Sequence, residues 1–419
     1  MKRLLSFLAV AAFVPAAQAI DYSMGAEYRV RFQHDNKADF DKDGDSENMF
    51  MHRVRLAPTF RAGERFTFHA DLLHNKVWGS DTADALPTQR EEDSVYVYQA
   101  YGSWMVNDDF MLRFGQAAMT MGDGTVVAAN DWENNPYAFT GVMGTYDMEF
   151  GRLSFFGVKF ADEVAGGGAT NADPEANAYG LAYSVKALPE ALNMVNVHLI
   201  QVNRDHEARG TSTAEEQLRY GLTVAGETAG VDYRATYAAH TGETKDATGQ
   251  KLLDREGSMY HIEVGYSLPD MMNSRFYVAY HSDSGNKGNA GKDESYDSFF
   301  YDMHNNAGLM DVLRWGNLTY ISLGYTLSPM EDLDLGLHYH MFSRTEENAG
   351  IFGRDGAVPA ADLVSGEKQI GSEINLVATQ RYSDDFQIQA WVGQFMPGKA
   401  VGEDLDSYTQ VFVEAKMTF

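Results

Sequence analysis

Apolar and polar residues alternate with a period of two along most of the chain. In the segment 24–32, Met24, Ala26, Tyr28, Val30 and Phe32 occupy alternate positions, and glycine or charged residues occupy the others. Successive side chains of a β-strand point to opposite faces, so this pattern predicts a strand that separates an apolar medium from water. The alternation recurs and predicts eighteen strands: 24–32, 50–60, 66–72, 96–104, 110–115, 139–146, 153–160, 179–185, 195–201, 218–224, 231–239, 260–268, 276–280, 319–327, 333–341, 370–378, 386–392 and 409–419.

The segments between these strands alternate in length. Short links such as 62–64 and 107–109 hold turn residues, whereas the links between them are long and polar: 35–48, 79–93, 117–136, 162–176, 204–216, 241–257, 282–316, 345–367 and 397–406. Short turns at one end and long loops at the other are typical of a bacterial outer-membrane barrel, and barrels of this strand number enclose water. The prediction is therefore an all-β protein: one transmembrane antiparallel barrel over residues 20–419, with 18 strands, long extracellular loops and short periplasmic turns.

Both ends of the chain agree with export to that membrane. Residues 1–3 are basic at two positions, 4–14 are apolar, and Ala17-Gln18-Ala19 has the spacing that a signal peptidase reads, so residues 1–19 are predicted to be a secretory signal peptide cleaved near Ala19. No later stretch is apolar enough to predict a membrane helix. The last strand alternates up to Phe419, as in proteins that the outer-membrane insertion machinery receives.

Composition argues against several classes of partner and site. The chain carries 60 Asp and Glu against 33 Lys and Arg, a formal net charge of −27, which argues against a nucleic-acid partner. It contains no cysteine, which excludes disulfides, zinc–thiolate sites and a cysteine nucleophile.

The predicted inward face nevertheless carries more bases than acids. Its arginines are Arg29, Arg31, Arg53, Arg55, Arg113, Arg219, Arg234 and Arg275, joined by Lys159, Lys186 and Lys416, and its acids are Glu27, Asp71, Asp232, Glu263, Asp334, Glu373 and Glu414. Basic side chains that line a pore favour anions, so this face predicts an anion path. In the alternative, the wall charges pair with each other and keep the lumen wet.

Two patterns suggest metal binding. Asp39, Asp41, Asp43 and Asp45 resemble the first half of an EF-hand loop, but Phe50 stands where a bidentate glutamate is required. This segment predicts either a weak calcium site or a solvated acidic loop that faces lipopolysaccharide. His338 and His340 share a strand face that could bind a metal or simply line a wet lumen. No other cofactor is expected.

Catalysis has little support in the sequence. No P-loop, HExxH or GxSxG motif occurs, and pairs such as His240 with Asp232 are not distinguished by their spacing. The chain is therefore predicted not to be an enzyme. The longest loop, 282–316, mixes aromatic residues with acids and is expected either to fold over or into the lumen as a gate or to form a free surface lid.

The ordered motifs resemble those of the alginate export porin family, in three stretches. The first holds Gly115, Gln116, Asp123, Asp131 and Trp132; the second holds His304, Gly308, Asp311, Trp315 and Asn317; the third is the strand around Glu373. The resemblance implies an 18-stranded monomeric barrel with an electropositive conduit for anionic polysaccharide or smaller solutes. Gln116 replaces the usual arginine of the family and Thr140 the usual aspartate, which we expect to alter the charge of the constriction.

The favoured hypothesis is a passive outer-membrane channel that conducts anionic solutes, including alginate-like polysaccharide, through a lumen lined by Arg and Lys. Its partners would be the lipid bilayer, lipopolysaccharide, the insertion machinery and the solute. A general diffusion porin for small nutrients is the first alternative. A rim-active outer-membrane hydrolase or a purely structural barrel is an alternative of a different class.

Overall fold

The computed structural model describes residues 21–37, 40, 46–79, 92–160, 176–205, 213–304, 306–353, 356–402 and 405–419. The predicted signal peptide, 1–19, and the acidic residues Asp39, Asp41, Asp43 and Asp45 lie outside the described residues. The signal peptide and the calcium site therefore remain predictions.

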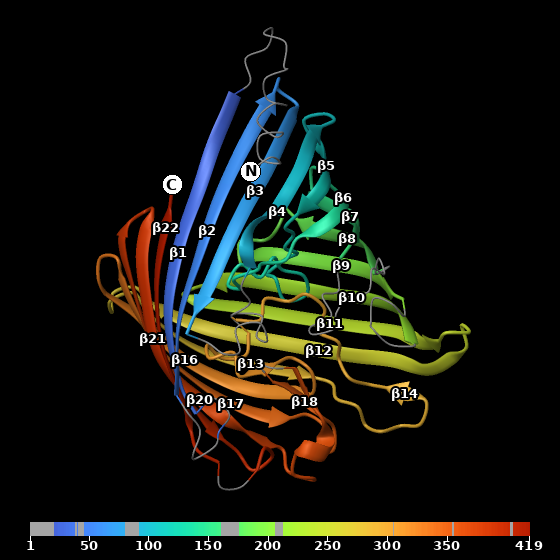
Figure 1. Ribbon diagram of the computed structural model, residues 1–419, viewed down its shortest axis with the longest axis vertical. Helices are drawn as coiled ribbons and strands as arrows, with labels where there is room; N and C mark the ends of the chain where they lie inside the picture. Colours follow the sequence, from blue (N-terminus) through green and yellow to red (C-terminus); the bar gives the residue numbers. More distant parts are fainter. Residues whose placement is uncertain are drawn as a thin grey trace.

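Eighteen long antiparallel strands form the wall, as predicted (Figure 1). The first wall strand, β1, pairs with both β2 and the last strand, β22, which closes the barrel. The wall strands are β1 (Asp21–Asn36), β2 (Ser46–Ala62), β3 (Phe66–Trp78), β4 (Glu92–Met105), β5 (Phe110–Ala117), β6 (Phe139–Asp147), β7 (Gly151–Lys159), β8 (Asn177–Val185), β9 (Leu192–Arg204), β10 (Thr213–Thr228), β11 (Val231–Asp246), β12 (Lys251–Leu268), β13 (Ser274–Asp283), β16 (Leu318–Met330), β17 (Leu333–Arg344), β20 (Gln369–Ser383), β21 (Phe386–Pro397) and β22 (Tyr408–Thr418).

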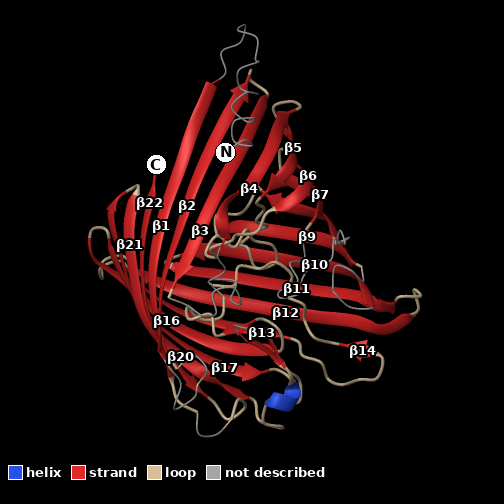
Figure 2. Cartoon of the chain, viewed as in Figure 1, coloured by secondary structure: helices blue, strands red, loops and turns tan. Residues whose placement is uncertain are grey.

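Short elements occur in the long connections. They are β14 (Lys292–Asp293), β15 (Leu313–Arg314), β18 (Ile351–Gly353), β19 (Gly356–Val358) and the 3₁₀ turn η2 (Ala360–Asp362). Figure 2 shows how little of the described chain is helical, and no helix there is long and apolar enough to cross a membrane.

The wall strands are often longer than the predicted segments. For example, β12 begins at Lys251, whereas the alternation predicts a strand from residue 260. The added stretch, 251–259, places charged residues at 254–256 and leucines at 252 and 253, so it does not alternate; it extends beyond the apolar belt towards the long loops. Alternation therefore reveals the part of a strand in contact with lipid and misses its extension into water.

The two faces of the wall differ as the period of two requires. On β1, Met24 and Tyr28 point outward and are exposed, whereas Arg29 and Arg31 point inward and are buried. The short turns form tight hairpins at the rim opposite the long loops. Ala229 and Gly230, which join β10 to β11, have φ of 50° and 78°. Positive φ at both residues gives a two-residue turn whose twist matches that of the flanking strands. A sheet that satisfies its backbone hydrogen bonds by closing on itself can span a bilayer.

Three residues face the opposite way from their prediction. Gln116, Thr140 and Lys159 lie opposite one another on β5, β6 and β7, on the outward face that also carries exposed Val142. Gln116 is three residues from inward-facing Arg113, and an odd spacing along a strand reverses the face. Gln116 and Thr140 therefore do not set the charge of a constriction, and Lys159 is not a lumen cation. Lys186 follows β8 at the short-turn rim, where it binds Asp147 at 2.5 Å.

Leu376, in the middle of β20, points to lipid with 62% of its surface exposed, whereas its neighbour Val377 lines an interior cavity. We expect Leu376→Arg to lower the free energy of unfolding by about 2–4 kcal/mol, because a cation at the bilayer midplane is poorly solvated. Val377→Arg is the matched control and should cost far less. Denaturant unfolding in lipid vesicles measures both; equal losses would contradict the assignment of the faces.

Candidate functional site

Two long connections turn inward and meet inside the ring of strands (Figure 1). They are loop 118–138, between β5 and β6, and loop 284–317, between β13 and β16. Val127 forms a β-bridge with Phe300, and the Ala128 N–H donates to the Phe300 carbonyl at 2.6 Å. The rings of Trp132 and His304 stack with centroids 3.5 Å apart. The lumen is therefore partitioned where the two loops touch.

Loop 284–317 is anchored to the inner wall. Trp315 is 1% exposed and stacks on His281 of β13 at 4.2 Å. The Glu373 carboxylate of β20 accepts hydrogen bonds from the Leu309 and Met310 N–H groups, at 2.7 and 3.1 Å. These partners point into the lumen, so the part of the loop from 296 to 317 lies inside the barrel, whereas β14 pairs with the extension of β12 beyond the wall (Figure 1). The alternative of a free surface lid is therefore wrong for residues 296–317.

The arginines of β1 and β2 hold loop 118–138 in the lumen. Arg29 donates to the carbonyls of Asp131 and Glu133, and Arg53 donates to the same two carbonyls at 2.9 and 2.8 Å. Arg31 donates to the Trp132 carbonyl at 2.6 Å, and its guanidinium lies 3.8 Å from the Trp132 ring centroid. Guanidinium groups present several donors in a rigid fork, which suits them to clamping a backbone segment.

Carboxylates balance this cluster. Arg53 binds Glu27 at 2.7 Å and both Asp131 oxygens at 3.1 Å. Further ion pairs of the cluster join Arg55 to Asp71 and Asp131, Arg31 to Glu414, and Lys416 to Glu27. The predicted inward orientation is correct, and these contacts favour mutual pairing of the charges at this part of the wall.

The other predicted lumen arginines differ from one another in their partners. Arg275 binds Asp232 and Glu263, and Arg219 donates to Asp297 of loop 284–317. Arg234 stays 3.7 Å from Asp123 and 3.8 Å from Glu263. Arg113 lies over the Tyr101 ring at 4.3 Å and makes no ion pair with any described residue.

The structure gathers most of the family-motif residues at the loop contact. Asp131 and Trp132 come from one loop, and His304 and Asp311 come from the other, where they bind each other at 3.0 Å. Trp315 and Glu373 anchor the second loop, and Asp123 caps a turn through Thr125. Gly115 has φ of 124°, and a Cβ there would lie 2.3 Å from the Ala100 carbonyl oxygen, so only glycine fits.

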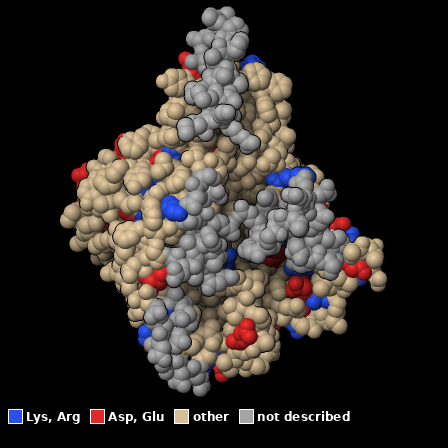
Figure 3. Space-filling model, in the orientation of Figure 1, with Lys and Arg blue, Asp and Glu red and all other residues tan. Residues whose placement is uncertain are grey.

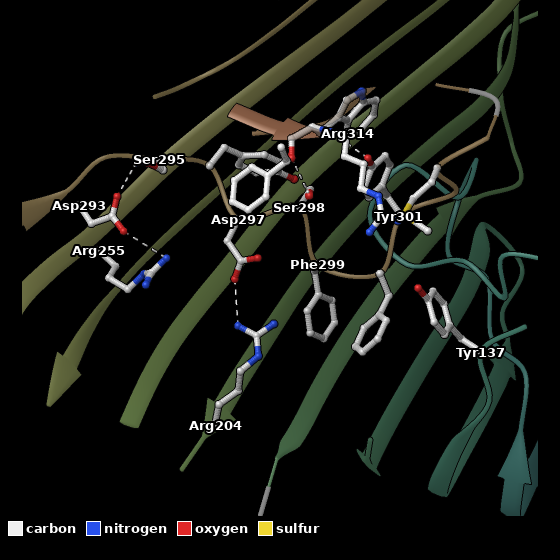
Figure 4. Close-up of a pocket in the computed structure, with 15 residues that line it drawn as sticks. Tyr137, Arg204, Arg255, Asp293, Ser295, Asp297, Ser298, Phe299, Tyr301 and Arg314 are labelled. Atoms are coloured by element: carbon white, nitrogen blue, oxygen red, sulfur yellow. Dashed lines mark hydrogen bonds and ion pairs between the residues drawn. The ribbon is translucent and has the colours of Figure 1, made fainter. Parts of the chain in front are cut away.

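Two cavities lie on either side of the partition. The cavity nearer the long loops, here the outer cavity, measures about 560 Å³ and is drawn in Figure 4. Its lining includes Tyr137, Arg204, Arg255, Asp293, Asp297, Phe299, Phe300, Arg314 and Phe352. The inner cavity, nearer the short turns, measures about 570 Å³, and its lining includes Arg29, Arg31, Asp131, Trp132, Tyr277, His304, His338, His340, Gln387, Gln389, Glu414 and Lys416.

The sequence analysis missed the three arginines of the outer cavity. Arg204 and Arg255 lie on the inward faces of β9 and β12, beyond the points where the apolar alternation ends. Continuing the alternation of inward and outward positions along each strand would have identified them. Arg314 lies in a two-residue strand of a loop, for which no sequence pattern exists. Figure 3 shows acidic and basic side chains interspersed on the visible exterior, with no continuous patch of one sign.

The histidines that the sequence singled out, His240, His338 and His340, have hydroxyl or backbone partners. Within the inner cavity, Nδ1 of His338 lies 2.8 Å from the Tyr277 hydroxyl and Nδ1 of His340 lies 2.6 Å from the Ser322 hydroxyl. His240 accepts a hydrogen bond from the Asp297 N–H at 3.1 Å, whereas Asp232 binds Arg275, so that suggested pair is not brought together. Among the described residues, no group of three His, Asp or Glu side chains is placed to hold a metal ion.

Two acids of loop 118–138 titrate differently because their surroundings differ. Burial raises the pKa of Asp131, but the positive charges of Arg53 and Arg55 lower it by more. The pKa of Asp131 is therefore below its ordinary value. Burial and the nearby charge of Asp311 raise the pKa of Glu133 to about 8, against the opposing effect of Arg314. The first carboxyl is therefore a permanent anion and the second is mostly neutral at pH 7.

A family model described as alginate export matches residues 21–413. No curated protein matches the chain.

Solved structures with the same fold are outer-membrane proteins of low sequence identity. The outer membrane protein OprD from Pseudomonas aeruginosa is 12% identical, with a TM-score of 0.60 over 97% of this chain and 95% of that chain. OpdK from Pseudomonas aeruginosa, solved with vanillate, is 12% identical, with a TM-score of 0.60 over 95% and 98%. OccAB2 from Acinetobacter baumannii has the same values. Likeness at this identity shows the fold alone.

We expect Asp131→Asn to loosen loop 118–138, because it removes the charge that Arg53 and Arg55 share. A charge-assisted hydrogen bond contributes about 1.5–3 kcal/mol, so amide exchange at 129–136 should be roughly 10- to 100-fold faster. Hydrogen exchange with mass spectrometry measures this. Asp147→Asn, at the opposite rim, is the control; unchanged exchange in the Asp131 variant would show that the clamp does not hold the loop.

Anion preference should fall as pH rises through about 8, because ionised Glu133 adds a negative charge at the partition. The raised pKa also means that the stabilising contribution of this group is complete below its ordinary value of 4.5 and is lost as pH rises towards about 8. Reversal potentials across planar bilayers measure the preference. Glu133→Gln should remove the step, and a step that persists in this variant would assign it to another group.

Proposed function

This chain belongs to the alginate export family, and we propose that it is a passive outer-membrane channel for anionic solutes. Its fold is that of an outer-membrane porin, in which solutes pass through the lumen of the barrel. Transport of this kind needs no bond chemistry, only a wet path and weak binding along it.

The observation that carries the proposal is the excess of cations in the outer cavity. Among the described residues, Arg204, Arg255 and Arg314 line it together with only two carboxylates, Asp293 and Asp297. In the inner cavity, by contrast, the cations Arg29, Arg31 and Lys416 are matched by Asp131, Asp302 and Glu414. The excess positive charge therefore lies on the path of a solute although the chain as a whole carries a formal charge of −27, and a low-dielectric wall focuses its field into the lumen.

The loop contact favours small anions over a polymer. Val127 and Phe300, and Trp132 and His304, touch across the lumen, so an extended chain would have to part them. Each cavity is of a size that suits one small organic molecule. The vanillate in the OpdK structure is an organic anion of this size class. Export of an alginate-like polymer is the second candidate, which the family match favours.

We further propose the route by which the chain reaches its membrane. Cleavage near Ala19 would release residues 1–19, and the last strand, which ends at Phe419, would engage the insertion machinery. The Asp39–Asp45 segment would either bind Ca²⁺ weakly or face lipopolysaccharide as a solvated acidic loop.

We expect purified protein in planar bilayers to show anion preference, and Arg314→Gln to reduce it about 2- to 5-fold by removing the outer-cavity cation that has no counter-charge among the described residues. Liposome uptake should be fastest for organic monoanions and should fall steeply with the length of alginate oligomers. Arg152→Gln, an exposed change at the short-turn rim, is the control. Cation preference would overturn the proposal, and undiminished uptake of long oligomers would favour the polymer exporter.

A further inference from the structure

We propose that the outer cavity is a binding site for aromatic carboxylates, in which Arg314 holds the carboxylate and Phe299, Phe300 and Tyr137 contact the ring. This inference rests on the proposed function, because it names the class of anion that the channel selects. It is carried by the arrangement of charged and aromatic side chains in one cavity (Figure 4).

Arg314 differs from the other two arginines of the cavity. Arg204 binds Asp297 at 2.9 Å and Arg255 lies 3.4 Å from Asp293, and Figure 4 draws both ion pairs. Both arginines also bind Glu215. The backbone of Arg314 pairs with Phe352 between β15 and β18, but its guanidinium makes no hydrogen bond or ion pair with any described residue.

Glu133 interacts electrostatically with both Arg314 and Asp311, but neither acid forms an ion pair with Arg314. Asp311 is bound to His304 at 3.0 Å. Glu133 is buried, and its raised pKa of about 8 keeps most of it protonated near pH 7. A half-buried guanidinium without a counter-charge in a low-dielectric lumen favours an incoming anion, and its fork matches a carboxylate with two parallel hydrogen bonds.

The wall next to this cation is aromatic. Phe299 and Phe300 lie 4.7 Å apart and are tilted by 68°, and Tyr137 meets Phe300 edge to face at 5.2 Å. These three rings are only partly buried and line the cavity, whereas Tyr301 and Trp315 behind them are buried and stacked. A further ring can join such a cluster edge to face, which a saturated ring of the same size does less well.

The volume fits this class of ligand. A cavity of about 560 Å³ accommodates a single substituted aromatic ring with water around it. Aspartates 293 and 297 are engaged by Arg255 and Arg204 on the far side, so the net positive charge lies at Arg314. A ligand with one carboxylate and one ring satisfies both features at once.

Isothermal titration of the detergent-solubilised protein tests the proposal with three probes. Benzoate carries the charge and the ring, cyclohexanecarboxylate has the charge with a saturated ring, and benzyl alcohol has the ring without the charge. We expect benzoate to bind with one site per chain, roughly 2- to 10-fold more tightly than cyclohexanecarboxylate, and benzyl alcohol not to bind measurably.

Arg314→Gln should weaken benzoate binding by about 10- to 100-fold, because a charge-assisted pair of hydrogen bonds is lost. Arg314→Lys should retain part of the affinity, and Arg152→Gln should retain all of it. Phe299→Leu should reduce the benzoate preference while leaving cyclohexanecarboxylate binding unchanged. Equal binding of the two acids, or benzoate binding that survives in the Arg314→Gln protein, would overturn the proposal.

Bilayer recordings distinguish failure of the aromatic-carboxylate site from failure of the proposed channel function. Anion-selective conductance with no difference between the two acids leaves the channel in place and removes the aromatic site. Conductance that benzoate blocks in the unaltered protein, with the block relieved in Arg314→Gln, supports the site independently of calorimetry.

Discussion

Closure of the backbone hydrogen-bond ladder between β1 and β22 is the constraint on which the rest of the molecule depends. In lipid, an unpaired strand edge costs several kcal/mol for each exposed backbone group, so the sheet must end on itself. Closure fixes one face of every strand towards lipid and the other towards water. Polar side chains therefore gather inside, and the two inward loops find hydrogen-bonding partners there that lipid could not offer.

Because closure enforces a strict alternation, the strands could be predicted from the sequence. Each of the eighteen predicted segments overlaps a wall strand, and the inward orientation of Arg29, Arg31, Arg53 and Arg55 followed from parity alone. The same rule explains the errors. Gln116 and Thr140 were interpreted through the family motif rather than through their parity with Arg113, and parity places them on the outward face.

The site was less predictable, because it depends on contacts between loops that have no period. Asp131, Trp132, His304 and Asp311 were identified from the resemblance, but nothing in the sequence indicates that Trp132 lies between Arg31 and His304. Such a stack requires two loops about 170 positions apart in sequence to fold against one wall. The sequence also cannot distinguish an arginine that holds a loop from one that meets a solute.

That distinction determines how the charge of the lumen should be understood. A guanidinium that donates to backbone carbonyls and binds two carboxylates, as Arg53 does, is a structural cation whose field is largely cancelled at short range. A guanidinium without such partners, as Arg113 and Arg314 are among the described residues, projects its field into the lumen. The number of basic residues on the wall is therefore a poor measure of anion preference, because the anchors of loop 118–138 contribute little to it. The selectivity of the barrel should follow the few cations that folding leaves without a counter-charge.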